Sequence, residues 1–450
     1  MTGASSKPVI LVVVDGLTPT MLEAAVEAGR APVIASLVEH GTYGRATSVF
    51  PSLTPVCLSS ISTGAHGDVH EIPHLVWYHR GERRLVEYGS SFGAVRAAGI
   101  GRTLRDTIVN MNTQHLGRRA VTVFEALGDA GLRTASVNFT AYRGRTPHRS
   151  SVPFLGEVRG PDQFFFYNLF RGERTGAPLS FRNRSAGSID AYAAAVGRWL
   201  VTRDSFDFLV YYLSDYDYAS HEHGPDVAFD ALGRCDAAIG TLADAAGGLD
   251  GLLDRYALVV LSDHGQTRVR ETASLRARYA AVEGALPAAS NRAAHVYALE
   301  GCRLDPRQLA AVLDPEPAVD VTLFREGSEA IARREGEELR FAPGPAGWHL
   351  SGDATILDHP DALSRSWAAL RNPNAGEVLA SAADGWEFED LGGRHHLGGG
   401  SHGSLLAGDS EVPLLTVGIG GAPRSIVDVA PLVLRHFGVA TPPYALDRAA

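Results

Sequence analysis

Acidic and imidazole side chains directly follow two apolar runs of this sequence. Asp15 follows the run Val9–Val14, and Asp263 and His264 follow the run 256–261 after a single Ser. Carboxylates and imidazoles are ligands that Zn²⁺ takes in proteins, and Mn²⁺ or Fe accept the same mixture. Taken singly, each of these segments is also typical of a turn or a capped loop. Taken together, they predict a divalent-metal site at the ends of the two runs.

A third apolar run, residues 206–213, is followed by a polar segment with several Asp and His. Asp217 and His221 are four residues apart, so on a helical turn they share a face and suit one ion. Asp215 and His223 form a competing pair in the same segment. A polar cluster directly after a buried strand favours ligand binding over core packing, and the choice between the two pairs stays open at this point.

The segment 392–404 is rich in Gly and contains three His. Glycines let a backbone approach a bound ligand closely, although a flexible surface loop has the same composition. His395, His396 and His402 are therefore all candidate ligands. With the acidic segments, the whole set is large enough for two ions.

A hydroxyl suited to nucleophilic attack follows the extended run 43–50. Thr54-Pro55 is typical of a helix start, with Thr as the N-cap and Pro at the first helical position. The free N–H groups and the dipole at that end of a helix favour anions. A nucleophile placed there attacks a phosphorus whose oxygens the backbone partly stabilises, so phosphoryl chemistry is a candidate activity.

Strands that alternate with helices must position these residues. The three apolar runs, with a fourth at 412–418, are separated by helical patterns, and the closing segment places Ile426, Val429 and Val433 at helical spacing. Near-continuous apolar strands of this kind are covered on both faces. We therefore expect an α/β fold with a mostly parallel central sheet and helices on both faces.

Two stretches interrupt this alternation. Residues 144–187 are rich in Gly, Arg and aromatic side chains, and residues 269–388 mix short strand-like runs with Gly- and Pro-rich joints. We expect a core made of residues 8–268 and 389–440, and a smaller inserted cap-like subdomain in residues 269–388. Near its start, residues 275–288 have the composition of solvated surface helices.

The ordered motifs resemble the alkaline phosphatase superfamily and, within it, the nucleotide pyrophosphatase (type I phosphodiesterase) branch. They are VVVDG, FPSLTP, SDYDYASHEHGPD, SDHGQ and GGSHGS, and they extend from Asp15 to His402. The closing segment SIVDVAPLVLRHFGV is similar to the terminal helix of that superfamily. No single motif is specific, but their order is. The resemblance implies an alkaline-phosphatase-like fold and a metal-dependent phosphoric ester hydrolase.

The resemblance also implies a role for each matching residue. One divalent ion would be held by Asp15, Thr54, Asp263 and His264. The other would be held by Asp217, His221 and His402. The Asp-x-x-x-His spacing of the branch favours this pair over its competitor. Thr54 would be the nucleophile of a two-metal reaction through a phospho-threonyl intermediate, with two Zn²⁺ ions expected and Mn²⁺ or Fe as alternatives.

Departures from the branch pattern bear on the substrate. The branch carries an Asn that holds a phosphate oxygen, but residues 64–75 contain none, and His74 lies near its place. The four His in residues 66–79 are expected to lie on the surface or behind the metal ligands. Thr54 is not followed by the Arg of monoester-specific alkaline phosphatases, and no sulfatase motif is present. A phosphodiester or pyrophosphate substrate is therefore preferred.

Other functions stay open alongside this preference. A phosphomonoesterase, phosphonate hydrolase or phosphomutase on the same metal core is the nearest alternative. A non-catalytic protein that binds phosphoryl ligands is an alternative of another class, although every expected ligand position is filled.

The composition limits the kinds of binding partner and the cell compartment that we expect. The 450 residues include 41 Lys and Arg against 51 Asp and Glu, a formal net charge of −10, and an acidic chain is a poor candidate for binding nucleic acid. Three widely spaced Cys suit a reducing compartment. The N-terminus lacks the pattern of a signal peptide, and no apolar run reaches the roughly 20 residues of a membrane helix. We expect a cytoplasmic enzyme that acts on a small phosphorylated substrate, without nucleic acid or membrane partners, in an undefined oligomeric state.

Overall fold

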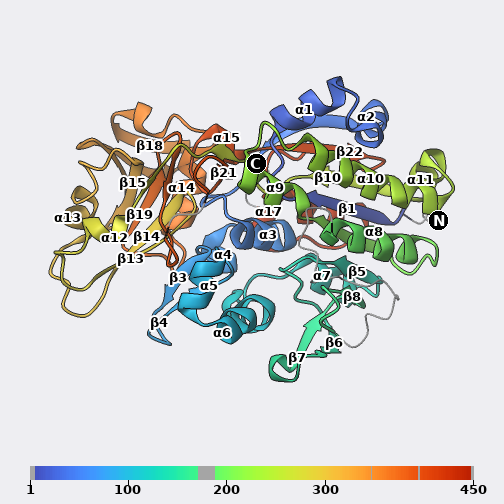
Figure 1. The fold of residues 1–450 in the computed structure, drawn as a ribbon, viewed down its shortest axis with the longest axis horizontal. Helices are drawn as coiled ribbons and strands as arrows, with labels where there is room; N and C mark the ends of the chain where they lie inside the picture. The colour runs from blue at the N-terminus through green and yellow to red at the C-terminus, as the bar shows by residue number, and fades with distance from the viewer. Residues whose placement is uncertain (1–5, 171–187, 346, 394–395, 447–450) are drawn as a thin grey trace.

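The computed structural model describes residues 6–170, 188–345, 347–393 and 396–446. These residues form two seven-stranded sheets that lie side by side, with four shorter two-stranded pairings (Figure 1). The mostly parallel sheet lies on the right of the view and the second sheet on the left. Within the described ranges, no helix combines the length and the apolarity needed to cross a bilayer.

The central sheet confirms the expected α/β class. In spatial order its strands are β2 (Thr42–Thr47), β22 (Glu411–Val417), β10 (Ala257–Leu261), β1 (Val9–Val14), β9 (Phe208–Leu213), β5 (Thr134–Val137) and β8 (Gln163–Phe165). The five strands from β10 to β8 pair in parallel, and β22 is antiparallel to both of its neighbours. The sequence pattern does not predict β8, because this three-residue edge strand lies in the irregular stretch 144–187, of which 171–187 are outside the described residues.

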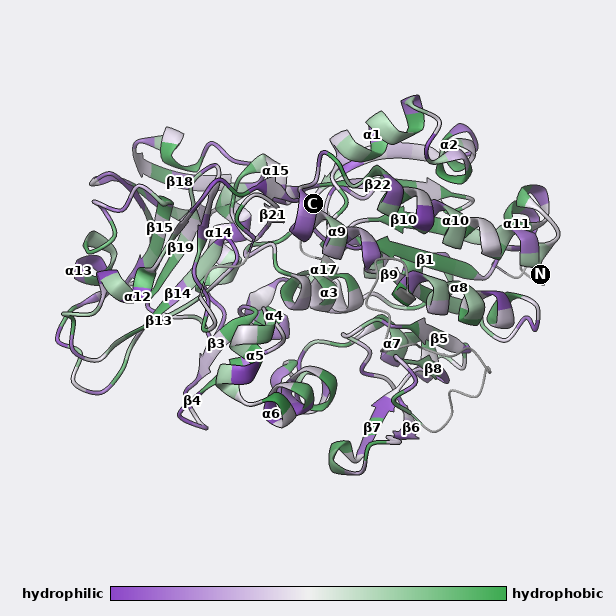
Figure 2. Ribbon diagram, viewed as in Figure 1, coloured by the Kyte–Doolittle hydropathy of each residue, from purple (hydrophilic) through white to green (hydrophobic). Residues whose placement is uncertain are grey.

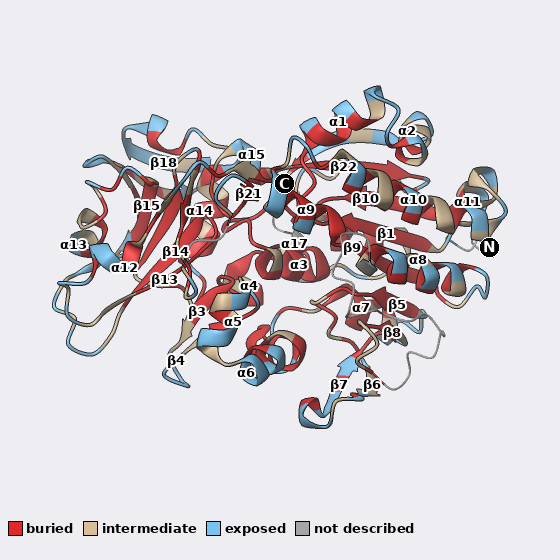
Figure 3. Ribbon diagram, viewed as in Figure 1, coloured by how far each residue is buried: buried red, intermediate tan, exposed pale blue. Residues whose placement is uncertain are grey.

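Helices cover both faces of this sheet. They are α1 (Pro19–Glu27), α2 (Pro32–Glu39), α3 (Thr54–Thr63), α7 (Val123–Asp129), α8 (Ser188–Val201), α9 (Asp215–His223), α10 (Phe229–Ala246), α11 (Leu249–Arg255) and α16 (Val429–His436). Along β1, alternate side chains pack with α3, α7 and α16 on one face and with α1, α2, α8 and α10 on the other. Strands buried on both faces read as continuous apolar runs, which is why the sequence reveals them (Figures 2 and 3).

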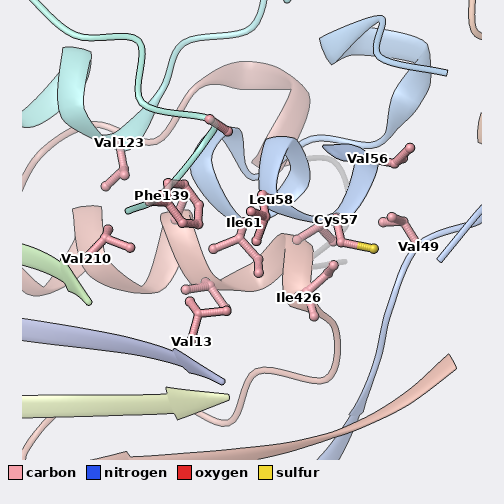
Figure 4. Close-up of a cluster of buried hydrophobic side chains, with 14 of the residues drawn as sticks. Val13, Val49, Val56, Cys57, Leu58, Ile61, Val123, Phe139, Val210 and Ile426 are labelled. Carbon is pink, nitrogen blue, oxygen red and sulfur yellow. The ribbon is translucent and has the colours of Figure 1, made fainter. Parts of the chain in front are cut away.

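The packing of α3 fixes the position of the predicted nucleophile. Val56 and Ile61 of this helix are buried in the cluster that also contains Val13 of β1 and Ile426 (Figure 4). The helix begins at Thr54, the expected N-cap, and therefore one residue earlier than predicted; it ends at Thr63, and Gly64 follows in the left-handed conformation. Because one face of α3 is held by the apolar core, its first residue is presented at the edge of the sheet.

The chain between α3 and α7 forms a series of short elements. They are α4 (Gly67–His70), the β3–β4 hairpin (Val76–His79 and Arg84–Glu87), α5 (Phe92–Ala98), α6 (Ile100–Arg105) and a π-helix (Asp106–His115). Other short elements are a 3₁₀ turn (Pro153–Leu155), the β6–β7 hairpin (Thr146–Arg149 and Glu157–Gly160), β11 (Thr267–Arg268), β21 (Gly400–Ser401), α15 (Ala407–Ser410), a second 3₁₀ turn (Ile426–Asp428) and α17 (Pro443–Leu446). None of these was expected in detail from the sequence.

The second sheet is antiparallel throughout. In spatial order its strands are β13 (Ala285–Ser290), β14 (Ala293–Ala298), β19 (Val378–Ala382), β15 (Val319–Glu326), β16 (Glu329–Arg334), β17 (Glu337–Gly344) and β18 (Gly347–Gly352). Its helices are α12 (Leu275–Arg278), α13 (Pro306–Ala311), a 3₁₀ turn (Ala354–Leu357) and α14 (Ala362–Leu370). The sheet lies within residues 269–388, and the division of the chain into core and inserted subdomain stays a prediction.

One expectation within this region is wrong. Residues 275–288 do not continue as surface helix, because α12 ends at Arg278 and Ala285 begins β13. The strand carries Pro287, which fits because β13 is the edge strand of the sheet and pairs with β14 alone within it. Its Ala-rich composition is typical of helices, so burial against the rest of the sheet overrides the local preference.

A buried ion pair ties the second sheet to the core. Nε of Arg292, in the β13–β14 turn, lies 2.8 Å from Oδ2 of Asp409, and both side chains are 0% exposed. The backbone N–H and the hydroxyl of Ser404 donate to the same carboxylate. Asp409 therefore joins the β13–β14 turn to the loop that follows β21.

Replacing Arg292 by Met is expected to lower the free energy of unfolding by about 3–5 kcal/mol, because Asp409 would stay buried without its charge partner. Urea unfolding followed by tryptophan fluorescence measures the change. Arg30→Met is the matched control, since Arg30 pairs with Asp230 at side-chain exposures of 55% and 86%, and such surface pairs contribute about 0–1 kcal/mol. Equal losses in the two variants would contradict this account of Arg292.

Candidate active site

Three strand ends bring the predicted ligands together. Asp15 directly follows β1, Asp263 lies just beyond β10, and α9 begins just beyond β9. These strands are parallel neighbours, so their carboxyl ends meet at one edge of the sheet. The loop after β21, which pairs with β11, adds His402 at the same edge. Every predicted site residue lies in this one region.

Three oxygen atoms surround Nε2 of His264. Oγ1 of Thr54 lies 3.0 Å away, Oδ1 of Asp15 3.3 Å away and Oδ2 of Asp263 3.5 Å away. The other ring nitrogen, Nδ1, lies 3.0 Å from the carbonyl oxygen of Gly265, which can only accept a hydrogen bond. With a cation bound, the ring would be neutral, its proton would belong on Nδ1, and Nε2 would present its lone pair to the ion.

A second cluster lies beside the first. Nε2 of His221 is 3.3 Å from Oδ2 of Asp217, and His402 completes a group whose ligand atoms lie within 4.8 Å of one another. Nδ1 of His221 contacts the Gly400 carbonyl at 2.7 Å, and Nδ1 of His402 contacts the Ser52 carbonyl at 2.8 Å. As in the first cluster, these carbonyls leave Nε2 of each ring as the ligand nitrogen.

Asp217 connects the two clusters. It also forms a group with Asp15 and His264 within the same 4.8 Å limit, and the rings of His264 and His402 stack at 3.6 Å. Gly16 makes this approach possible, because a Cβ at that position would lie 2.7 Å from Oδ1 of Asp217, and its φ is +70°. The Asp-Gly pair that resembles a simple turn in the sequence is therefore a close contact within the site.

Buried negative charge dominates the site. Burial and the charge of Asp217 raise the pKa of Asp15, and burial and the charge of Asp15 raise the pKa of Asp263 well above its usual range. Burial alone would lower the pKa of His264, but Asp263 and Asp15 raise it to about 10. Oδ1 of Asp15 and Oδ2 of Asp263 are buried without a hydrogen-bond partner. A cation in the first cluster would satisfy both oxygens.

The competing Asp–His pair of the sequence does not join the site. Oδ2 of Asp215 accepts the backbone N–H of Asp190 in α8, and His223 is exposed on the last turn of α9. The helical i, i+4 spacing thus brings Asp217 and His221 together on the face of α9 that meets the strand ends.

Of the two other His candidates of the Gly-rich segment, the structure describes one, His396. His396 stacks on the ring of His221 at 4.0 Å, and its Nδ1 lies 2.5 Å from Oε1 of Glu387. It therefore lies behind a predicted ligand and holds that ring in place. His395 lies outside the described residues.

For the His of residues 66–79 a surface position and a position behind the metal ligands were both expected, and the surface position is wrong for three of them. His66, His70 and His74 are at most 8% exposed. Nε2 of His70 lies 3.1 Å from the hydroxyl of Ser60 in α3. The ring of His74 packs 5.0 Å from that of His295 in the second sheet. His70 therefore packs against α3, and His74 packs against the second sheet.

Sequence reasoning missed two side chains that bind the carboxylates. The Tyr212 hydroxyl on β9 donates to Oδ2 of Asp15, and Nε2 of Gln266 donates to Oδ1 of Asp217. Gln266 follows the SDHG motif directly, so its place after a strand end was a usable signal. Tyr212 is one of several apolar or aromatic residues in β9, and nothing local separates it from the others.

Asn291 is the third missed residue, and it comes from the second sheet. Its Nδ2 lies 3.1 Å from Nε2 of His402, and it occupies the β13–β14 turn at a φ of 55°. No signal in the surrounding sequence indicates this contact, since it depends on how the two sheets meet.

Comparisons with known proteins identify the family and the fold of the chain. A family model described as type I phosphodiesterase / nucleotide pyrophosphatase matches residues 9–405. Phosphonoacetate hydrolase from Sinorhizobium meliloti 1021, solved with phosphonoformate, has a TM-score of 0.65 at 20% identity over 99% of this chain and 96% of that chain. Murine ectonucleotide pyrophosphatase/phosphodiesterase 5, solved as an inactive Thr-to-Ala variant with AMP, has a TM-score of 0.63 at 14% identity over 97% and 96%.

These likenesses share the alkaline-phosphatase-like fold, and the family match covers most of the chain. The chain therefore belongs to the type I phosphodiesterase / nucleotide pyrophosphatase family of the alkaline phosphatase superfamily, and it is a metal-dependent phosphoester hydrolase.

Proposed function

We propose that the protein hydrolyses a phosphodiester or pyrophosphate bond, with Thr54 as the nucleophile. The observation that carries the proposal is the convergence of Thr54, Asp15 and Asp263 around Nε2 of His264. A hydroxyl this close to two carboxylates and an imidazole, at the first residue of a ten-residue helix, has the surroundings of an activated nucleophile.

The donor atoms fit two divalent cations. One would be held by Asp15, Thr54, Asp263 and His264, and the other by Asp217, His221 and His402. The distances of 3.0–3.5 Å around Nε2 of His264 resemble the ~3.4 Å between ligands bound tetrahedrally at about 2.1 Å. Mixed His and Asp ligation suits Zn²⁺, with Mn²⁺ or Fe as alternatives. Bound cations would lower the pKa of the Thr54 hydroxyl and stabilise the leaving oxygen.

The side chains divide the reaction into two displacements. Oγ1 of Thr54 gives up its proton and attacks the phosphorus, the bond to the leaving oxygen breaks, the leaving oxygen takes up a proton, and a phospho-threonyl ester forms. A water then attacks the same phosphorus, and Oγ1 leaves and regains a proton. The carbonyls of Gly265, Gly400 and Ser52 hold the imidazole rings in one orientation through both steps.

Hydrolysis of a phosphonate is the second candidate. Phosphonoacetate hydrolase has a similar fold over nearly the whole chain, and residues 64–75 lack the Asn that the phosphodiesterase branch carries. Turnover of bis-p-nitrophenyl phosphate, p-nitrophenyl phosphate and phosphonoacetate by the Zn²⁺-loaded enzyme separates the candidates. We expect the highest kcat/KM for the diester. A higher value for phosphonoacetate favours the second candidate, and no turnover of any substrate contradicts the proposal.

Asn291 is proposed to hold a phosphate oxygen in place of the missing Asn. Its amide lies beside the predicted ligand nitrogen of His402, so it has the position needed to donate to a bound phosphoryl group. Asn291→Ala is expected to lower kcat/KM for the preferred substrate by about 10²-fold, the effect of removing one donor from a developing negative charge. Steady-state kinetics measures the loss.

Asn374→Ala is the control for this prediction, because the Asn374 amide donates instead to the carbonyl of Glu71. It should leave kcat/KM within about twofold, as expected for a residue without a contact to the reacting group. An Asn291→Ala enzyme with the kinetics of the wild type would remove Asn291 from the site.

A further inference from the structure

The β3–β4 hairpin and the last residue of the π-helix bring together His79, Glu82 and His115. One potential ligand atom from each of these side chains lies within 4.8 Å of the other two. They share no residue with the two clusters of the candidate active site. We propose that they form a third divalent-metal site, with Zn²⁺ as the ion that suits two imidazoles and one carboxylate.

His115 provides the strongest support for this site. The residue is 3% exposed, and its Nε2 is buried without a hydrogen-bond partner. Its Nδ1 lies 2.7 Å from the hydroxyl of Tyr88. When Nδ1 donates to that hydroxyl, Nε2 carries a free lone pair, which is the usual arrangement of a metal-binding His. A metal ion would satisfy an atom that is otherwise buried without a partner.

The three side chains can close around an ion with small movements. Ligand atoms bound tetrahedrally at about 2.1 Å lie ~3.4 Å apart, so gaps of up to 4.8 Å must shrink by an ångström or so. Glu82 is exposed at the hairpin turn and His79 is half-buried, so both have room to move. Nδ1 of His79 accepts the backbone N–H of Glu82 at 3.0 Å, so the His79 ring must turn and give up this hydrogen bond to offer a nitrogen to the ion. His115 is the fixed member, held by Tyr88 and by edge-to-face packing on Trp77 at 5.3 Å.

The charges around the cluster are compatible with a cation. Arg84 is the nearby positive side chain, and it lies 2.5 Å from Oε2 of Glu82 and 2.6 Å from Oδ2 of Asp106. Asp106 therefore balances the charge of Arg84, and Oε1 of Glu82 remains for the ion. Burial lowers the pKa of His115 to about 4, so this ring is neutral and competent as a ligand at pH 7.

The proposed ion would cross-link two neighbouring elements. His79 ends β3, Glu82 lies in the hairpin turn, and His115 ends the π-helix. A cation bound to all three would hold the hairpin against the helix without touching the candidate active site. Its effect should therefore appear in metal content and thermal stability, and not in catalysis.

The test uses the full chain loaded with Zn²⁺, freed of excess metal by gel filtration and analysed by plasma mass spectrometry. His79→Ala and Glu82→Gln change side chains that are not buried, so both variants should fold. Each is expected to contain one Zn²⁺ fewer per chain than the wild type and to lose part of the rise in Tm that Zn²⁺ gives the wild type. Turnover of the diester should stay at the wild-type value. His349→Ala, on the exposed strand β18, is the control and should keep the wild-type metal content.

Tyr88→Phe tests the same site by another route. It keeps the ring and removes the hydroxyl that contacts His115, so the affinity for the third Zn²⁺ should fall about 10–100-fold. Competition with a chromophoric chelator measures this affinity. Metal content and chelator competition that are identical in the wild type, His79→Ala, Glu82→Gln and Tyr88→Phe overturn the proposal, whatever the diester activity.

Discussion

Thr54→Ala is expected to lower kcat/KM for bis-p-nitrophenyl phosphate by about 10³-fold or more, as removal of a covalent nucleophile does elsewhere. The substitution removes Oγ1, which lies 3.0 Å from Nε2 of His264, and leaves the carboxylates and imidazoles of both clusters in place. The methyl group of Ala also fits the first turn of α3, so folding should be unaffected. Initial rates at several substrate concentrations, with metal content measured in parallel, give the result.

Thr54→Ser is the matched control, because it restores a hydroxyl on the same carbon. It should recover a substantial part of the activity lost in Thr54→Ala. A second readout is covalent: wild-type enzyme quenched in acid during turnover should carry one phosphoryl group on Thr54, detectable by mass spectrometry, and Thr54→Ala should carry none. Full activity in Thr54→Ala would eliminate the proposed mechanism, and loss of metal from this variant would point to a ligand role alone.

The sequence predicts those site residues that directly follow a strand or share one face of a helix. Asp15, Asp263 and His264 directly follow continuous apolar runs, and parallel strands place such residues at a common edge. The i, i+4 spacing gives Asp217 and His221, because α9 begins at that point and orients both side chains alike. These predictions needed no knowledge of distant contacts.

Contacts between the two sheets are the part that the sequence does not predict. Asn291 reaches His402 through a turn of the second sheet, and β13 is a strand although its Ala-rich sequence is typical of a helix. In both cases the long-range packing decides the outcome, and no local pattern contains that information. The same holds for the π-helix that ends at His115, whose partners come from a separate hairpin.

The unsatisfied carboxylates of the site connect catalysis with stability. Burial raises the pKa values of Asp15 and Asp263, which means that in the folded chain without cations the charged form of each carboxylate carries an energetic penalty. A sequence selected for folding alone would not retain such a cluster at the end of three buried strands. If the site binds cations, replacing one of these carboxylates should reduce activity when metal is bound and increase stability when metal is absent.

Asp263→Asn is expected to lower kcat/KM for the diester by about 10²–10³-fold, because it removes a charge that stabilises the reacting centre through the metal. In the chelator-treated protein the same substitution should raise the free energy of unfolding by about 1–3 kcal/mol, since it removes a buried carboxylate oxygen that has no hydrogen-bond partner. The amide preserves the acceptor that receives the backbone N–H groups of Gly16 and His264. Urea unfolding with and without Zn²⁺, alongside kinetics, measures both effects.

The free energy of unfolding of the metal-free protein should also depend on pH, in a direction that a purely structural role of Asp263 would not produce. Burial and Asp15 raise the pKa of Asp263 in the folded state, so above pH ~4 the folded chain keeps a proton at this position that the unfolded chain releases. The contribution of this group to the stability of the metal-free wild type is present below that pH and is lost as the pH rises through the raised pKa. Asp263→Asn should flatten this decline of the free energy of unfolding with rising pH. Zn²⁺ should stabilise the wild type far more than the variant. A variant that is less stable than the wild type both with and without metal would show that Asp263 serves the fold and not a cation.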